Sequence, residues 1–269
     1  MLSIIIPVYN QPEMTRMCLE AVIKHTRDYE IIVVDNGSKE PFTPPAQRWV
    51  EVTEFGDIDR YYMGDEPGVG ALRVIRNEEN EGFPAAVNQG IRAVENEIIV
   101  LLNNDVIVTP GSLNRLEQYV KGGRISIVSP LTNYAAGMQC VTIGAYENDD
   151  GLNYEAKKLS EENAGKIAEV NFVIGFCMVF KKSLYEELGA FDESLWPCSG
   201  EEIDFCFRAR EAGHKIGIAH DVYLHHFGSK TFEDMGNAGI INYMEVVNRN
   251  DAHLAKKWGA DFWQRQAII

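Results

Sequence analysis

The chain has 269 residues, 45% of them hydrophobic, so it is long enough to bury the core of one large domain or of two smaller ones. Its 40 acidic and 25 basic side chains give a formal net charge of -15, which excludes a surface that binds nucleic acid or anionic lipid through basic residues. A pocket for a small phosphorylated ligand is compatible with this charge, because a divalent cation and backbone amides can neutralise phosphate.

Cysteine usage and the first residues indicate where the chain works. Its five cysteines are an odd number and lack the paired spacing of a zinc site, which favours a reducing compartment. The N-terminal segment lacks the basic leader and the apolar length of a signal peptide, and no apolar run approaches the about 20 residues that span a bilayer. We therefore expect a cytoplasmic protein without a transmembrane segment, and the sequence leaves its oligomeric state open.

Two apolar runs predict buried strands at residues 2–8 and 30–34. Asn10 followed by Pro12 predicts a helix start between these strands. Such a βαβ unit brings Asn10, Asp35 and Asn36 to the carboxyl ends of neighbouring parallel strands. In open α/β sheets this edge is the one that binds ligands.

Residues 40–70 interrupt the pattern with prolines, glycines and charges, which predicts an irregular surface excursion. This segment contains Gly68-Val69-Gly70, which resembles part of a dinucleotide-binding fingerprint. That interpretation fails, because no third glycine follows and a strand at residues 72–76 comes next instead of a helix.

A helix of small residues is predicted after Gly82 and Phe83, over residues 85–93, and it suits a close approach to a sheet or a ligand. The strand that follows ends in Asn103, Asn104 and Asp105. A polar triplet with one carboxylate at this edge can complete a metal-diphosphate site, although an Asn-rich turn has the same appearance. A helix over 111–120 and a strand over 125–129 extend the alternation, which predicts a three-layer α/β fold with a mostly parallel sheet.

The second half is less periodic. Residues 133–165 predict a mobile or acceptor-shaping insertion, followed by a strand within 170–180 that contains Gly175 and a helix over 183–188. A strand over 214–218 then leads to a polar loop that carries His225 and His226. The last helix, over 239–258, is expected to turn Tyr243 and Met244 inward, and the aromatic tail after it either packs back on the domain or meets a partner.

An acidic cluster lies in the loop and helix after Trp196. Ser199 or Gly200 is suited to cap a helix whose first turn carries Glu201, Glu202 and Asp204. Acids are favourable at the positive end of a helix. Carboxylates this close also raise one another's pKa, which suits a general base. Both interpretations stay open on the residues alone.

Several motifs occur in a specific order: Pro7-Val8-Tyr9-Asn10 and those at residues 33–38, 80–88, 102–105, 200–204 and 226–231. Together they resemble the family-2 inverting glycosyltransferases of the GT-A fold, especially the bacterial rhamnosyltransferase-like branch. The resemblance implies a Rossmann-like three-layer α/β/α domain over residues 1–232. Its nucleotide-sugar-binding half would span 1–130 and its acceptor-binding half 131–232, with a C-terminal helical extension over 233–269.

The resemblance also implies roles for individual residues. Those expected to bind the nucleotide sugar are Pro7, Tyr9, Asn10, Asp35, Asn36, Gly82, Phe83, Asn88, Asn103 and Asn104. Asp35 would accept a hydrogen bond from the base. Asp105 would hold Mn2+ or Mg2+ on the diphosphate, with His225 or His226 completing the site.

The catalytic and acceptor roles follow from the same resemblance. Glu202 would deprotonate the acceptor hydroxyl, with Glu201 competing for this role and Asp204 in the same catalytic cluster. Gly175 and Trp196 would contact the acceptor. One departure stands out, because Asn103 occupies a position where the family carries an acid, and this should weaken the cation site.

We therefore expect a metal-dependent, inverting hexosyltransferase of polysaccharide biosynthesis. It would move a sugar from dTDP-rhamnose or a UDP-sugar to a hydroxyl of a glycan, a lipid-linked saccharide or a protein. A nucleotidyltransferase would need a Gly-rich, Arg-bearing loop after the first strand, and Pro7-Val8-Tyr9-Asn10 is not one. A catalytically weak glycan- or nucleotide-sugar-binding module with the same fold is the other alternative, against which the retained Asp105, Glu202 and Asp204 argue.

Overall fold

The computed structural model describes residues 1–44, 49–55, 58–63, 71–228, 235–236, 239 and 241–267, and for residues 49–63 it describes the backbone alone. Within these residues, eleven strands form one sheet in the order β3-β4-β5-β2-β1-β6-β10-β8-β11-β7, with β9 paired to β11. The strands are β1 (Leu2–Val8), β2 (Tyr29–Asn36), β3 (Trp49–Phe55), β4 (Ile58–Met63), β5 (Ala71–Asn77), β6 (Ile98–Leu102), β7 (Val106–Ile107), β8 (Ile127–Thr132), β9 (Ile167–Val170), β10 (Cys177–Lys181) and β11 (Ile216–His226). The helices are α1 (Pro12–His25), α2 (Phe83–Ala93), α3 (Ser112–Lys121), α4 (Asp149–Glu162), α5 (Lys182–Leu188), α6 (Glu201–Glu211) and α8 (Tyr243–Trp258), with short 3-10 turns η1 (Gly137–Gln139), η2 (Glu193–Leu195) and η3 (Phe262–Arg265).

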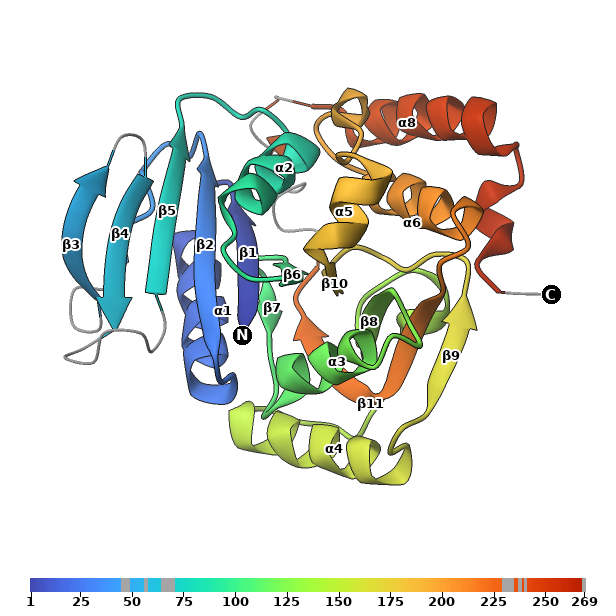
Figure 1. Ribbon diagram of the computed structural model, residues 1–269, viewed down its shortest axis with the longest axis horizontal. Coiled ribbons are helices and arrows are strands. Elements are labelled where there is room, and N and C mark those ends of the chain that lie inside the picture. Colours follow the sequence, from blue (N-terminus) through green and yellow to red (C-terminus); the bar gives the residue numbers. More distant parts are fainter. Residues whose placement is uncertain are drawn as a thin grey trace.

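Strands β5, β2, β1 and β6 pair in parallel and form the centre of the sheet. Every residue of β1, β2 and β6 is buried, which explains why their sequences are almost uninterrupted apolar runs. Strand β10 runs antiparallel between β6 and β8, and α2 packs on β1 and β2 (Figure 1). The structure confirms the expected α/β fold with a mostly parallel central sheet.

Gly90 marks the place where α2 approaches the sheet most closely. A Cβ atom added to Gly90 would lie 2.4 Å from Cγ2 of Ile5 and 3.4 Å from Cγ2 of Val34. We expect Gly90→Ala to destabilise the fold by about 1–3 kcal/mol through overpacking, measured as a lower Tm in thermal unfolding. A Gly-to-Ala change inside a helix otherwise stabilises it by up to about 1 kcal/mol, so an unchanged or raised Tm would contradict this packing.

The prediction of an irregular excursion is wrong for residues 49–55 and 58–63. These residues form strands, in which β3 pairs antiparallel with β4 and β4 with β5, so that the sheet extends beyond β5 (Figure 1). The β-branched and aromatic residues of this segment favour strands, but the flanking prolines and glycines obscured them. The Gly68-Val69-Gly70 motif lies outside the described residues.

Residues 133–165 also contain more regular structure than predicted. Helix α4 spans Asp149–Glu162, and the side chain of Asn148 accepts a hydrogen bond of 2.9 Å from the backbone N–H of Gly151. Two acids in its first turn, Asp149 and Asp150, favour the same start. The predicted strand within 170–180 begins only at Cys177, after an irregular link that contains Gly175.

The histidine pair lies in a strand, not in the predicted polar loop. Strand β11 runs from Ile216 to His226 and contains a bulge between Ala219 and Tyr223. This bulge breaks the alternation of side chains, which explains why the strand seemed shorter in the sequence. Its last residues pair with β7, with His226 opposite Val106.

The C-terminal helix turns a different face inward from the one predicted. Tyr243 and Met244 are 49% and 59% exposed, whereas Val246, Asn250 and Leu254 are buried. The aromatic tail packs back on the domain, since Phe262 is buried, and α8 lies beside α6 (Figure 1). Among the helices that the structure describes, none has the length and apolar character needed to cross a membrane.

Candidate functional site

A cavity of about 580 Å³ lies at the carboxyl ends of β1, β2 and β6. It brings together residues that are far apart in the sequence but were predicted to share a site. These are Pro7, Tyr9, Asn36, Phe83, Asn103, Asn104, Asp105, Gly175, Glu201, Glu202 and His226. The sheet edge predicted from the apolar runs is therefore the edge that holds the cavity.

Sequence reasoning missed part of the lining. Asn133, Tyr134, Cys198, Ser199 and Tyr243 also line the cavity. The first two follow the carboxyl end of β8, so the same rule that pointed to Asn103 could have found them. No comparable signal marks Cys198 or Tyr243, because they reach the cavity through the packing of α6 and α8.

Asp105 and His226 form a buried pair on one wall of the cavity. Nε2 of His226 lies 3.2 Å from Oδ1 of Asp105, and Nδ1 lies 2.8 Å from the backbone oxygen of Tyr134. Because a carbonyl oxygen can only accept, we assign a proton to Nδ1. Nε2 then presents a lone pair beside the carboxylate of Asp105, so the two side chains can bind one cation.

The surroundings hold the His226 ring in this orientation. Its plane stacks on Phe176 with ring centroids 5.2 Å apart, and Tyr134 meets its edge at 5.7 Å. The side chain of Asn133 bonds both backbone groups of His226, accepting from its N–H at 2.8 Å and donating to its oxygen at 2.9 Å. Such fixed imidazole geometry is typical of metal ligands.

Asn103 supplies a further oxygen. Its Oδ1 atom is buried and has no hydrogen-bond partner among the described residues, and a buried polar atom of this kind calls for an explanation. The carboxylate of Asp105, the imidazole of His226 and the amide oxygen of Asn103 suit a divalent cation such as Mn2+ or Mg2+. In the described part of the chain, no group of three or more His, Cys, Asp or Glu side chains is arranged to hold a metal. A cation here would therefore need oxygen ligands from a substrate.

Glu201 and Glu202 also line the cavity. They open α6 behind Gly200, and Oε2 of Glu202 accepts a hydrogen bond of 3.2 Å from the N–H of Gly200. Burial raises the pKa of Glu201 well above its usual range, and the charge of Glu202 raises it further. Burial also raises the pKa of Glu202, while backbone N–H groups oppose this shift. Both carboxyls therefore bind a proton more readily than an exposed glutamate does, which suits a general base.

Gly175 supports Glu202. A Cβ atom at this position would lie 3.1 Å from Cβ and 3.2 Å from Cγ of Glu202. The glutamate side chain therefore packs directly on the glycine backbone. The sequence predicted that Gly175 contacts an acceptor, and the structure adds this contact with the proposed base.

The structure separates the two histidines. Side chains of successive strand residues point to opposite faces, and Nδ1 of His225 lies 2.6 Å from the hydroxyl of Tyr146. Burial and the neighbouring His226 lower the pKa of His225, although Asp105 opposes this shift. Of the two histidines that the sequence offers as metal ligands, His226 is the one among the described residues that line the cavity. It is therefore the favoured candidate, and its role as a metal ligand stays a prediction.

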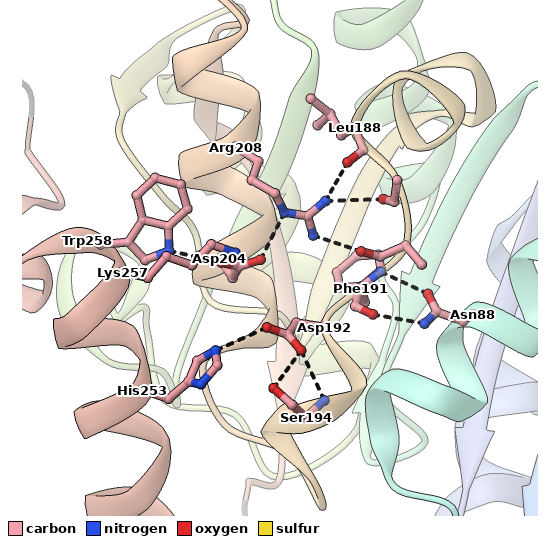
Figure 2. Close-up of polar contacts among 12 residues, drawn as sticks. Asn88, Leu188, Phe191, Asp192, Ser194, Asp204, Arg208, His253, Lys257 and Trp258 are labelled. Carbon is pink, nitrogen blue, oxygen red and sulfur yellow. Dashed lines mark hydrogen bonds and ion pairs between the residues drawn. The ribbon is translucent and has the colours of Figure 1, made fainter.

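Two predicted site residues have their polar groups bonded within the fold (Figure 2). Asn88 is fully buried; its side chain donates to the oxygen and accepts from the N–H of Phe191, both at 3.0 Å. Its amide joins α2 to the loop after α5, and its contact with the nucleotide sugar stays a prediction. The sequence motif alone does not show whether the side-chain amide of Asn88 binds a ligand or the protein backbone.

Asp204 is also fully buried, and its carboxylate is occupied by other side chains (Figure 2). It accepts from Arg208 Nε and Trp258 Nε1, both at 2.9 Å, and lies 2.6 Å from Lys257 Nζ. The structure does not support the predicted catalytic role, because this carboxylate binds α8 and its own helix and is not among the described cavity residues.

The remaining candidates lie next to the described lining. Asp35 is buried and accepts from the backbone N–H groups of Ser38 and Phe42 at 3.2 and 2.7 Å. Asn10 bonds the same loop, because its Oδ1 accepts from the N–H of Lys39 at 3.0 Å. Both order the segment after β2, and their direct contact with a nucleotide stays a prediction.

Gly82 and Trp196 meet each other. A Cβ atom at Gly82, where φ is +90°, would lie 2.6 Å from Cδ1 of Trp196. The N–H of Phe83 donates to the oxygen of Pro197 at 2.6 Å. Trp196 thus joins the loop before α6 to the start of α2, while its neighbours in that loop face the cavity.

Comparisons with known proteins agree with this geometry. The sequence matches the family model described as Glycosyl transferase family 2 over residues 3–189. Glycosyltransferase AglE of Haloferax volcanii is 26% identical over 223 residues, which cover 82% of this chain and 64% of AglE. The chain thus spans less than two thirds of the length of this relative.

Two solved structures share the fold. The crystal structure of GalNAc-T7 with UDP, GalNAc and Mn2+ has a TM-score of 0.61 at 18% identity, over 84% of this chain and 42% of that one. The structure of S. aureus TarS 1-349 has a TM-score of 0.55 at 15% identity, over 97% and 72%. These likenesses show the GT-A-like fold, and the family model matches more than half of the residues, so the chain belongs to glycosyl transferase family 2.

Proposed function

We propose that this chain transfers a sugar from a nucleoside-diphosphate sugar to a hydroxyl group, with inversion at the anomeric carbon and with a divalent metal. The observation that carries the proposal is the convergence of the Asp105–His226 pair and the Glu201–Glu202 pair on one cavity. The first pair suits a cation on a diphosphate, and the second suits removal of a proton from an attacking hydroxyl.

The charge of the cavity supports a metal. Among its described lining residues, Asp105, Glu201 and Glu202 are acidic and none is Lys or Arg. An anionic diphosphate needs compensating charge, and Asp105, His226 and Asn103 would hold the Mn2+ or Mg2+ ion that provides it. When bound, this ion would stabilise the negative charge that develops on the departing nucleoside diphosphate.

Glu202 would take the proton from the acceptor hydroxyl. Its buried position and the N–H of Gly200 hold the carboxylate in one orientation. A hydroxyl activated there would attack the anomeric carbon on the side opposite the diphosphate, which inverts the configuration. We favour Glu202 over Glu201, because Oε2 of Glu202 accepts the hydrogen bond from Gly200 whereas Oε2 of Glu201 has no hydrogen-bond partner among the described residues.

The donor and the organisation of the chain are part of the same proposal. UDP and Mn2+ are bound in the GalNAc-T7 structure, which favours a UDP-sugar as the first donor to test, with dTDP-rhamnose, from the rhamnosyltransferase-like resemblance, as the second. We keep a nucleotide-sugar half over residues 1–130 and an acceptor half over 131–232. A cytoplasmic location and a part in polysaccharide synthesis, with a saccharide or protein acceptor, are proposed on the same resemblance.

The test is a panel of nucleotide sugars, each offered with Mn2+, with Mg2+ and with a chelator. We expect one donor to release its nucleoside diphosphate when metal is present, and NMR of the product should show the inverted anomer. Failure of every donor to bind in the presence of metal would contradict the proposal. Saccharide binding without turnover would instead support a binding module.

A further inference from the structure

The backbone carbonyls of residues 195–199, which precede the cap of α6, all accept hydrogen bonds from α8 or from the start of α2. Nδ2 of Asn250, in α8, donates to the oxygens of Leu195, Cys198 and Ser199 at 3.0, 2.9 and 3.1 Å. The guanidinium of Arg249 donates to the oxygen of Trp196. The fifth carbonyl, that of Pro197, accepts from the start of α2. Residues 195–199 are thus held from two sides, mainly by α8.

The side chain of Asn250 is held in position for these bonds by its neighbour Arg249. Asn250 is 1% exposed, and Nε and Nη2 of Arg249 donate to its Oδ1 at 3.1 and 3.0 Å. This contact fixes which end of the amide is the oxygen, so that both amide hydrogens point to the loop. Two hydrogens serve three carbonyls, which requires at least one shared hydrogen bond.

The loop held by Asn250 leads directly to the glutamate pair. Pro197, Cys198 and Ser199 line the cavity. Ser199 has a φ of +93° and Gly200 one of +96°, and a residue with a side chain adopts such an angle only when its surroundings hold it there. Asn250 bonds the carbonyl of Ser199 itself, at the turn that sets the direction of Glu201 and Glu202.

Further contacts join α8 to α6 along its length. A Cβ atom on Gly200 would lie 2.4 Å from Cδ1 of Leu254. Lys257 and Trp258 reach Asp204, and His253 lies 3.2 Å from Asp192 of the preceding loop (Figure 2). These contacts tie α8 to α6 and to the loop before it.

We propose that Asn250 is a positioning residue for the transfer reaction, acting through Ser199 and Gly200 on the Glu201–Glu202 pair. The inference rests on the proposed function. Asn250 is not among the described residues that line the cavity, so it acts on the carboxylates without touching substrate. Helix α8, which the sequence places in a C-terminal extension, then belongs to the catalytic unit.

The main test is Asn250→Asp, which keeps the size of the side chain but replaces both donor hydrogens with an acceptor facing three carbonyls. Asn248→Asp is the matched control, because Asn248 is exposed on the same helix. A displacement of about 1 Å at a catalytic group can cost about 10²-fold in rate, so we expect N250D to lower kcat by about tenfold or more. The Kd for the nucleoside diphosphate with Mn2+ should change by less than about twofold, and N248D should match the wild type.

The pH profile separates positioning from general damage. If N250D displaces the Glu201–Glu202 pair, the acidic limb of its kcat–pH profile should lie at a different pH from that of the wild type. If N250D only lowers the amount of folded enzyme, kcat should fall by the same factor at every pH. If N250D does not fold, Arg249→Ala releases the orientation of the Asn250 amide from an exposed position and should show the same changes to a smaller degree. If the folded variants keep the wild-type kcat and pH profile, the inference about Asn250 is wrong and the proposed function is unaffected. Absence of turnover by the wild type with every donor would overturn the proposed function and this inference with it.

Discussion

Replacing Glu202 with Gln is expected to lower kcat by about 10²–10⁴-fold, the usual contribution of a general base. The amide has the same shape and can still accept the hydrogen bond from Gly200, but it cannot take up a proton. Affinity for the nucleotide sugar should therefore stay within about twofold of the wild-type value. Steady-state kinetics with the donor found in the panel, together with calorimetric binding of that donor, would measure both quantities.

Two further variants give this result its meaning. Glu211→Gln changes an exposed glutamate at the far end of the same helix and should leave kcat unchanged. If Glu201→Gln abolishes turnover while Glu202→Gln keeps it, the base is Glu201 and the assignment is wrong.

The dependence of the activity on pH has a defined sign as well. Because burial raises the pKa of both carboxyls, activity should fall with decreasing pH at a higher pH than for an exposed glutamate.

Replacing Asp105 with Asn is expected to lower kcat/KM by at least about 10²-fold, since metal stabilisation of the leaving group contributes several kcal/mol. Asp105 is the anionic member of the proposed donor set, because Asn103 is neutral. The variant should also lose the part of nucleoside diphosphate affinity that depends on Mn2+. Calorimetric titrations with and without the metal would measure that part directly.

Asn103→Asp provides the opposite change at the same site. It adds a second carboxylate where the resemblance leads one to expect an acid, so we expect tighter Mn2+ binding than in the wild type. In the wild type, Oδ1 of Asn103 has no hydrogen-bond partner among the described residues. The substitution therefore breaks no described hydrogen bond of that oxygen. If neither substitution alters the response to metal, the cation is held elsewhere and the proposed site is wrong.

The centre of the fold could be predicted because burial on both faces leaves a direct trace in the sequence. Strands β1, β2 and β6 are almost uninterrupted apolar runs, and polar residues stand at or just after their carboxyl ends. The sequence therefore indicated both the position of these strands and the edge that binds ligands. Strands β3 and β4 and helix α4 left weaker traces. Their sequences mix polar and apolar residues, and the prolines, glycines and charges around them matched the pattern of loops.

A site residue could be predicted only where the type of its side chain determines what it binds. Asp105 and Glu202 have the required chemistry and do line the cavity. Asn88 and Asp204 have suitable chemistry too, but their groups are occupied by Phe191 and by Arg208 and Trp258. Asn250 was missed because a buried polar residue in a helix has no periodic signal of its own.

The acidic lining of the cavity also has a kinetic consequence. The free donor is an anion that approaches a chain of formal net charge -15, and no described lining residue is Lys or Arg. Added salt slows the encounter of oppositely charged partners, but here it should screen a repulsion and speed donor association. A donor that arrives already complexed with its cation meets a smaller barrier, so metal should raise the association rate as well as the affinity.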